Sequence, residues 1–322
     1  MVDGRAGHAR VVILGVTPLE SEVQNEEFGA DTEVMSEGVF APRATLNCTT
    51  ADGKPCLPLI LAVCTDRSNG PAQETAMHLL ERWKPEYIIL CGTAGGILRR
   101  EERPHRQPRL VGPVPGDVVV GEFIHYADYG KKLQGHEFKH RYLPVVHPPT
   151  RLTKKHTQKL TSFPYEWPER VLKHHPKYRR RNGVSVVGST PTIHRGEIVA
   201  VEAVAGDPLD SKQQWLVSHF DKALAVDMES HGVARALHDN EMGVHYRPSW
   251  LCVRGISDPV VGSDEDLQLL KKNKNNERER RKWERYAASA AAHVARVITE
   301  RILATPRPPH PQQIGAPAWK AN

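Results

Sequence analysis

The stretch "LAVDMESHGVARAL" at residues 224–237 places two acids where an apolar run changes into a helical pattern. The first residues are typical of a buried strand, whereas the apolar residues of the second half recur at helical spacing. Asp227 and Glu229 flank Met228 at the point of change. In open α/β sheets ligands bind at the carboxyl ends of the strands, so these acids are candidates for a functional site.

Similar apolar runs recur along the chain and alternate with helical patterns. The runs are continuous and do not alternate with polar residues, which predicts strands covered on both faces. The predicted strands are 10–16, 57–64, 86–92, 116–124, 184–190, 222–228 and 249–257, and the predicted helices are 72–83, 230–239 and 284–303. This order predicts an α/β fold of three αβα layers, with helices on both faces of a central sheet.

The composition is that of a globular chain, with 322 residues of which 39% are hydrophobic. We predict one domain at 10–304, followed by a disordered tail at 305–322 that is rich in proline and polar residues. No run approaches the roughly 18 apolar residues of a membrane span, and the start does not resemble a secretory signal, so a cytoplasmic location is predicted. The five cysteines form no CxxC pair, which favours reduced thiols and predicts no metal site.

Two segments are strongly charged. Residues 131–182 hold fourteen Lys and Arg against three Glu, a composition that could bind nucleic acid or the phosphates of a ligand. No base-stacking motif accompanies them, so we favour a basic surface elaboration and do not predict a nucleic-acid partner. Residues 266–285 form either an exposed lid or a solvated helix, and we favour the helix.

Four strand ends carry residues suited to chemistry. Acids occur in "GVTPLESEV" at 15–23, in "VRGISDPV" at 253–260 and in the stretch at 224–237 described above. The fourth end, "CGTAGGI" at 91–97, offers glycines and a hydroxyl. A lone acid after a strand can simply cap a helix, but four such ends together indicate a site. "GTAGG" fits neither the dinucleotide nor the P-loop pattern, and no cofactor is predicted.

In this order the motifs resemble the nucleoside phosphorylase superfamily, above all its methylthioadenosine/S-adenosylhomocysteine nucleosidase branch. The resemblance covers about 10–303 and is carried by "TPLESEV", "GTAGG" followed by "GDVVV", "AVDMES", "VRGISD" and the closing "WERYAASAAAHVARVI". It implies a nucleoside phosphorylase-like fold with a central mixed sheet. It also implies a homodimer that acts on a small purine nucleoside or nucleotide, such as an adenosine-like compound.

The resemblance implies a role for several acids. Glu229 would bind the ribose hydroxyls above Met228, while Asp227 would be structural. Asp258 would be the general acid that protonates the leaving purine. Glu22 would orient and deprotonate the attacking water. We prefer it to Glu20 because it directly precedes the apolar Val23, as in the family.

Other positions follow from the same likeness. Thr93, Ala94 and Gly95 would lie near the attacking water. The segment that reads the purine edge in the nucleosidases is replaced here, so that Glu202 stands for an aspartate of the family and the backbone of Val204 would meet the base.

The nucleophile is predicted to be water. Hexameric phosphorylases carry an arginine where this chain has Leu90, and "GVTPLESEV" is acidic where a phosphate would need hydrogen-bond donors. The sequence therefore predicts hydrolysis of the N-glycosidic bond to free base and a ribose product. A phosphorylase with an unusual phosphate site and a nucleoside-binding module without turnover remain as alternatives. The 5′ substituent of the substrate, a thioether, a hydroxyl or a phosphate, is left open.

Overall fold

The computed structural model describes residues 9–29, 43–44, 57–132, 138–161, 165–181, 184–186, 190–203, 207, 210–243, 247–270 and 276–304. The predicted tail at 305–322 lies outside these residues. The strands are β1 (Ala9–Gly15), β2 (Arg43–Ala44), β3 (Leu57–Val63), β4 (Tyr87–Ile97), β5 (Arg99–Glu101), β6 (Arg109–Val111), β7 (Val118–Tyr126), β8 (Gly130–Lys132), β9 (Phe138–His140), β10 (Arg179–Arg181), β11 (Val184–Val186), β12 (Ile193–Ala200), β13 (Ala223–Asp227) and β14 (Ser249–Val260).

Helices separate most of these strands in the sequence. They are α1 (Pro18–Phe28), α2 (Asn69–Trp83), α3 (Thr150–Thr161), α4 (Glu169–Leu172), α5 (Ser211–His219), α6 (Ser230–Gly243), α7 (Asp264–Leu269) and α8 (Asn276–Ala304). Helix α8 therefore begins eight residues before the predicted start at 284. The charged residues 276–285 are helical, as favoured from the sequence, whereas 271–275 lie outside the described residues.

Eight of the described strands form one sheet, in the order β13-β12-β7-β14-β4-β1-β3-β2. Strand β4 is parallel to both β1 and β14, and β7 is antiparallel to β14. Beyond this order, β13 also pairs with β4, in the antiparallel sense. The sheet is therefore mixed, as the resemblance implied.

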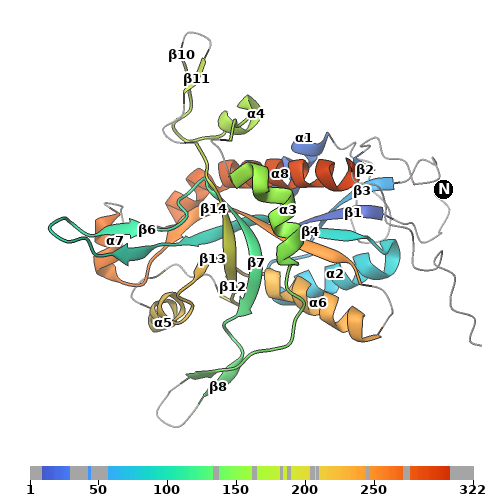
Figure 1. Cartoon of the computed structure of the whole chain (residues 1–322), viewed down its shortest axis with the longest axis horizontal. Coiled ribbons are helices and arrows are strands. Elements are labelled where there is room, and N and C mark those ends of the chain that lie inside the picture. Colours follow the sequence, from blue (N-terminus) through green and yellow to red (C-terminus); the bar gives the residue numbers. More distant parts are fainter. Residues whose placement is uncertain are drawn as a thin grey trace, which may run out of the picture.

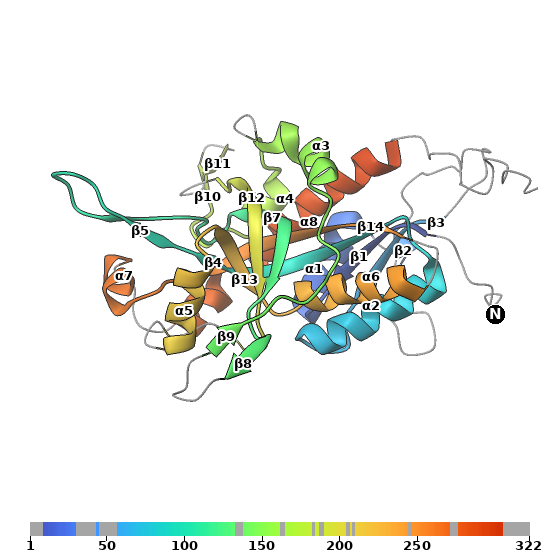
Figure 2. The same ribbon diagram turned by 60° about the horizontal axis from the view of Figure 1, so that its bottom comes forward.

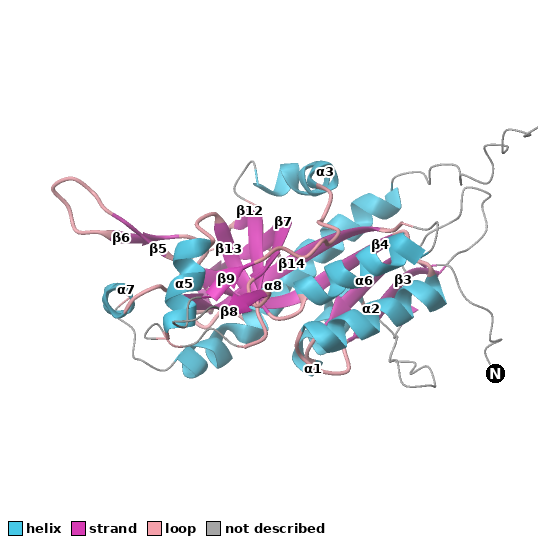
Figure 3. Ribbon diagram, turned by 90° about the horizontal axis from the view of Figure 1, so that it is seen from below, coloured by secondary structure: helices cyan, strands magenta, loops and turns pink. Residues whose placement is uncertain are grey.

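Apolar residues of each central strand point alternately to two separate cores. In β1, Val12 and Leu14 pack with α2 and α6 on one face, whereas Val11 and Ile13 pack with α1 and α8 on the other. Figure 1 shows α8 along one side of the sheet, and Figures 2 and 3 show α2 and α6 next to each other on the opposite side. Burial on both faces explains the continuous apolar runs, and the predicted three-layer αβα fold is confirmed.

Helix α1, which the apolar pattern did not predict, is set by its ends. Thr17 caps the helix by accepting a hydrogen bond from the amide of Glu20, and the Glu20 side chain returns the contact to the Thr17 amide. Pro18 occupies the first turn, where its missing N–H costs nothing. Gly29 ends the helix in the left-handed conformation, with φ 63°.

The prediction that residues 184–190 form a strand of the central sheet is wrong. Residues 184–186 form β11, which pairs only with β10 among the described strands, in a small hairpin. The sheet strand is instead β12, which lies between β7 and β13. In the first half of β12, Ile193 is followed by His194 and Arg195, which are polar and only partly buried, so this half lacks the apolar run that marks the other strands.

The described residues of the basic segment 131–182 lie on the outside of the sheet. They contribute strands to the β8–β9 and β10–β11 hairpins, which project from the body in Figure 1, together with α3 and α4. Arg170 of this segment holds α4 against α1 through a two-bond ion pair with Glu27, at 2.8 Å for each contact. Within the described part of the chain, no helix is long and apolar enough to cross a membrane.

Candidate active site

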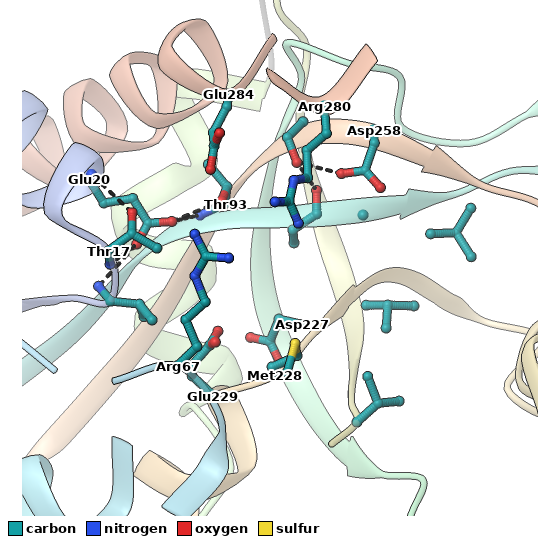
Figure 4. A pocket seen from close by; sticks show the side chains of 17 residues that line it. Thr17, Glu20, Arg67, Thr93, Asp227, Met228, Glu229, Asp258, Arg280 and Glu284 are labelled. Atoms are coloured by element: carbon teal, nitrogen blue, oxygen red, sulfur yellow. Dashed lines mark hydrogen bonds between the residues drawn. The ribbon is translucent and has the colours of Figure 1, made fainter. Parts of the chain in front are cut away.

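A pocket lies at the carboxyl ends of the central strands, where the sequence placed its candidates (Figure 4). Its lining includes the predicted residues Asp258, Glu229, Met228, Thr93, Ala94 and Gly95. They come from β4, from the junction of β13 with α6, and from β14. Since β4 pairs with both β13 and β14, these distant segments meet at one edge of the sheet.

Glu20 is the buried acid at the β1–α1 end of this pocket, with 3% of its surface exposed. Its Oε2 accepts hydrogen bonds from the amides of Val16 and Thr17, both at 3.0 Å. Its Oε1 accepts from the Thr93 amide at 2.7 Å and from the Thr93 hydroxyl at 2.8 Å. Four donors therefore fix this carboxylate between β1 and β4.

Glu22 lies elsewhere, so the prediction that placed it beside the attacking water is wrong in its geometry. Its side chain is 57% exposed and pairs with Arg285 at 3.0 Å. Residues two apart on a helix point about 200° away from each other, so Glu20 and Glu22 cannot face the same side of α1. Glu20, which we had ranked second, is the acid that lines the pocket.

A buried arginine explains the two carboxylates of the opening stretch. Arg254 has no exposed surface, and its guanidinium donates to Asp227 at 2.6 Å and to Glu229 at 3.1 Å. The other oxygen of Asp227 accepts from the Ser230 hydroxyl at 2.7 Å and from the Ser230 amide, at the start of α6. Both oxygens of Asp227 are thus engaged within the protein, which agrees with a structural role.

Glu229 lines the pocket with a carboxyl group whose pKa is raised. Burial raises its pKa to about 7; Arg254 opposes this shift, while the carboxylates of Asp227 and Glu20 add to it. The amide of Ser68 donates to it over a long 3.5 Å contact. With Met228 beside it in the lining, Glu229 presents a carboxylate that can accept hydrogen bonds from a ligand.

Asp258 reaches the pocket through an irregularity in β14. The register of β14 against β4 shifts between Ile256 and Asp258, leaving Ser257 as the extra residue. Such a bulge redirects the side chains that follow it. Ser257 donates its hydroxyl to Oδ1 of Asp258 at 2.6 Å, and Asp258 as a whole residue is 7% exposed.

Gly92 leaves the room that these charged groups need. A Cβ at this position would lie 2.6 Å from the Arg254 guanidinium and 2.8 Å from both oxygens of Glu20. Any side chain here would force these two groups to shift. The glycine that follows the apolar run of β4 is therefore required by the charged groups that cross over it.

Three charged lining residues were not predicted from the sequence. Arg67 follows β3, whereas Arg280 and Glu284 come from the first turns of α8. Figure 4 shows the guanidinium groups of both arginines directed into the pocket. Arg67 could have been found, because it too follows a strand end, in "TDRSNG" at 65–70. The α8 residues could not, because nothing local shows which part of a charged helix faces a distant sheet.

Glu202, which we expected to read the purine edge, does not line the pocket. Glu202 is exposed and accepts hydrogen bonds from the Tyr126 hydroxyl at 2.8 Å and from the Asn69 amide group at 3.0 Å. Its neighbour Val201 is the lining residue from this segment. Glu202 is thus engaged by Tyr126 and Asn69 outside the pocket lining. Val204 lies outside the described residues.

The part of the chain that the structure describes contains no cluster of metal-ligand side chains. No group of three or more His, Cys, Asp or Glu side chains there could hold a metal ion. Cys64, Cys91 and Cys252 are buried free thiols. Burial raises the pKa of the Cys64 thiol to about 12, so it stays protonated near neutral pH.

Solved structures with the same fold include nucleosidases. The methylthioadenosine/S-adenosylhomocysteine nucleosidase of Neisseria meningitidis, in complex with methylthio-immucillin-A, matches with a TM-score of 0.60 at 17% identity, over 91% of this chain and 99% of that chain. That of Colwellia psychrerythraea 34H, in complex with adenine, gives 0.57 at 15%, over 92% and 96%. Futalosine hydrolase of Helicobacter pylori strain 26695 gives 0.57 at 16%, over 91% and 98%.

At these identities the structural likeness establishes the fold. No curated protein matches the sequence of the chain. The family model of the phosphorylase superfamily matches residues 10–299, which is most of the chain and includes every described part of the pocket. The chain therefore belongs to the phosphorylase superfamily.

Proposed function

We propose that this protein is an N-ribosidase that hydrolyses the N-glycosidic bond of an adenosine-like purine nucleoside or nucleotide. The observation that carries the proposal is the meeting of three acids, Glu20, Glu229 and Asp258, in one pocket. Cleavage of this bond passes through a ribosyl cation. It therefore needs a group to hold the sugar, a proton for the leaving base and a nucleophile for C1′.

Glu229 is the sugar-binding group in this proposal. Its carboxylate accepts hydrogen bonds from the 2′ and 3′ hydroxyls, and its negative charge stabilises the positive charge that grows on the ribose. Met228 packs beneath the sugar. Arg254 holds Glu229 in place from the side opposite to the ligand, through the 3.1 Å ion pair.

Asp258 is the general acid. As the C1′–N9 bond breaks, its electron pair passes to the purine ring, and the Asp258 proton is transferred to N7 so that the base leaves as a neutral molecule. The hydroxyl of Ser257, 2.6 Å from Oδ1, fixes the orientation of the carboxyl group.

Glu20 and Thr93 hold the attacking water. A water that replaces the Thr93 hydroxyl as donor to Oε1 of Glu20 adds to C1′ and gives up a proton to this carboxylate, so that one water is consumed and a free ribose product forms. Glu20 thus takes the role that we had predicted for Glu22. The nucleosidases and the hydrolase among the structural neighbours support hydrolysis as the reaction class.

A phosphorylase is the second candidate, and the arginines of the pocket are the observation that favours it. Against it, Leu90 is fully buried in the apolar core and offers no charge to a phosphate. In addition, the backbone amides at the ends of β1 and β4 already donate to Glu20, so they are occupied by an anion. Water is therefore the better nucleophile.

The test is product analysis by chromatography after mixing the protein with adenosine, methylthioadenosine, S-adenosylhomocysteine, AMP and ATP. We expect a free purine base and a ribose product at the same rate with and without inorganic phosphate. Base release that requires phosphate and yields ribose 1-phosphate would identify a phosphorylase. Tight binding without base release over long incubation would identify a binding module.

A further inference from the structure

Arg67 and Arg280 enter the pocket without anionic partners. Among the described residues, neither guanidinium forms an ion pair, and the Nε atom of Arg280 is buried with no hydrogen-bond partner. Other arginines near this site are paired, as Arg254 is with Asp227 and Arg285 with Glu22. Glu284 lies one turn after Arg280 and also lines the pocket, yet the two side chains form no ion pair.

Two guanidinium groups directed into one space match a doubly charged ligand group. Arginine offers forked donors that suit phosphoryl oxygens, and its hydrogen bonds to anions are about twice as strong as neutral ones. A single carboxylate would neutralise only one of the two charges. A phosphoryl dianion is therefore the best match to Arg67 and Arg280.

The position of Glu20 indicates which molecule carries this group. Inorganic phosphate acting as the nucleophile would need the donors that now hold the Glu20 carboxylate, and it would be repelled by that charge. Arg67 instead directly precedes Ser68, whose amide contacts Glu229, the proposed sugar-binding acid. A phosphoryl group attached to the sugar avoids the carboxylate of Glu20 and lies near Arg67.

We propose that Arg67 and Arg280 bind the 5′-phosphoryl group of the substrate, so that this pocket cleaves purine nucleotides in preference to free nucleosides. This inference rests on the proposed N-ribosidase function. It also assigns phosphate binding to Arg67 and Arg280 and not to the basic segment 131–182, because no described residue of that segment lines the pocket.

The experiment compares kcat/KM for AMP, ADP, ATP, adenosine and S-adenosylhomocysteine. We expect AMP to be favoured over adenosine by tenfold or more, and Arg67→Gln and Arg280→Gln each to lower this ratio by about tenfold. Arg67→Lys should retain part of the preference, because it keeps the charge but loses the fork. Arg106→Gln is the matched control, since Arg106 is exposed in the β5–β6 hairpin and should not change the ratio.

Three results would overturn the proposal. One is an AMP-to-adenosine ratio near 1, or a ratio that the arginine substitutions leave at its original value. Another is a preference for S-adenosylhomocysteine that depends on both arginines, which would assign them to a carboxylate. The third is acceleration of adenosine cleavage by inorganic phosphate that is lost in the variants, which would assign them to the nucleophile.

Absence of turnover with every substrate would instead reject the proposed function. The arginine subsite is then judged by calorimetric binding of AMP and adenosine to the full chain. Tighter binding of AMP by tenfold or more, lost in Arg67→Gln and Arg280→Gln, retains the subsite. Equal affinity for the two ligands overturns it. Thermal unfolding curves of each variant show that the protein is folded.

Discussion

Asp258 is a buried residue near the carboxyl end of β14 and lines the pocket. Its substitution should affect the rate of bond cleavage and leave ligand binding in place. Asp258→Asn keeps the shape of the side chain but has no proton to give. General acid catalysis contributes on the order of 10² to 10⁴ in rate, so turnover should fall by that factor while nucleoside binding persists. Steady-state kinetics and calorimetry test both parts. A variant that retains more than about a tenth of the rate contradicts this assignment.

Glu20 and Glu22 provide a matched pair of substitutions. Glu20→Gln removes the charge from the pocket and keeps the size of the residue, and we expect kcat to fall by about 10² or more. Glu22→Gln removes only an exposed ion pair with Arg285, which contributes at most about 1 kcal/mol to folding. Its activity should stay close to that of the parent. Equal losses in the two variants would show that the fall is not specific to the pocket.

These residues also show where sequence reasoning succeeds at this scale. Asp258, Glu229 and Thr93 lie in short motifs at the ends of apolar runs, and the end of such a run can be located in the sequence within about one residue. The choice between Glu20 and Glu22 depends on the rotation of α1 about its axis. The apolar pattern did not predict this helix, so its phase could not be known. Hydrogen bonds from Thr93, 73 positions away in the chain, decide the matter.

At the scale of elements, apolar pattern predicted the central strands and failed where burial depends on neighbours. Strands β1, β4 and β14 are apolar on both faces and were placed correctly. Strand β12 runs between β7 and β13, but its polar first half hides it in the sequence. The charged residues 276–283 were favoured as a solvated helix apart from the predicted helix at 284–303, whereas they form the first turns of the same helix, α8. The approach of Arg280 to the pocket is a property of tertiary structure.

The β10–β11 hairpin allows a test of the basic segment. Arg179, Arg180 and Arg181 form β10, which pairs with β11 and contributes no residue to the described lining of the pocket. Substituting all three by Gln should leave both the AMP-to-adenosine ratio and its dependence on salt at the parent values. A nucleotide preference that disappears in this variant would return phosphate recognition to the basic segment. Weaker RNA binding with a shallower salt slope would indicate a nucleic-acid surface.

At the scale of the whole molecule, we predict a homodimer. The support is the resemblance to the nucleosidases, which implies a homodimer, together with exposed apolar side chains on this chain. Met242 is 77% exposed and Tyr142 is 72% exposed. Light scattering at micromolar concentration should give twice the mass of one chain. A monomer with full activity would contradict the prediction.

The burial of Glu229 links substrate binding to the exchange of protons with solvent. Burial raises the pKa of Glu229 to about 7 although Arg254, whose charge is shared with Asp227, opposes the shift, so this carboxyl group is partly protonated in the free protein at neutral pH. A sugar that prefers the ionised form lowers this pKa. Binding at pH 7 should therefore expel up to about half a proton per site. Affinity should also weaken as the pH falls below 7.

Calorimetry in buffers of different ionisation enthalpy measures this release. The Asp258→Asn protein is the suitable sample, since it should turn over its ligand on the order of 10² to 10⁴ times more slowly and lacks the proposed general acid. Glu229→Gln in the same background should bind with a heat that is the same in every buffer. If the heat is already independent of the buffer with Glu229 present, the ligand does not contact the ionised carboxylate. The burial of Glu229 thus makes recognition of an uncharged sugar hydroxyl visible as acidification of the medium.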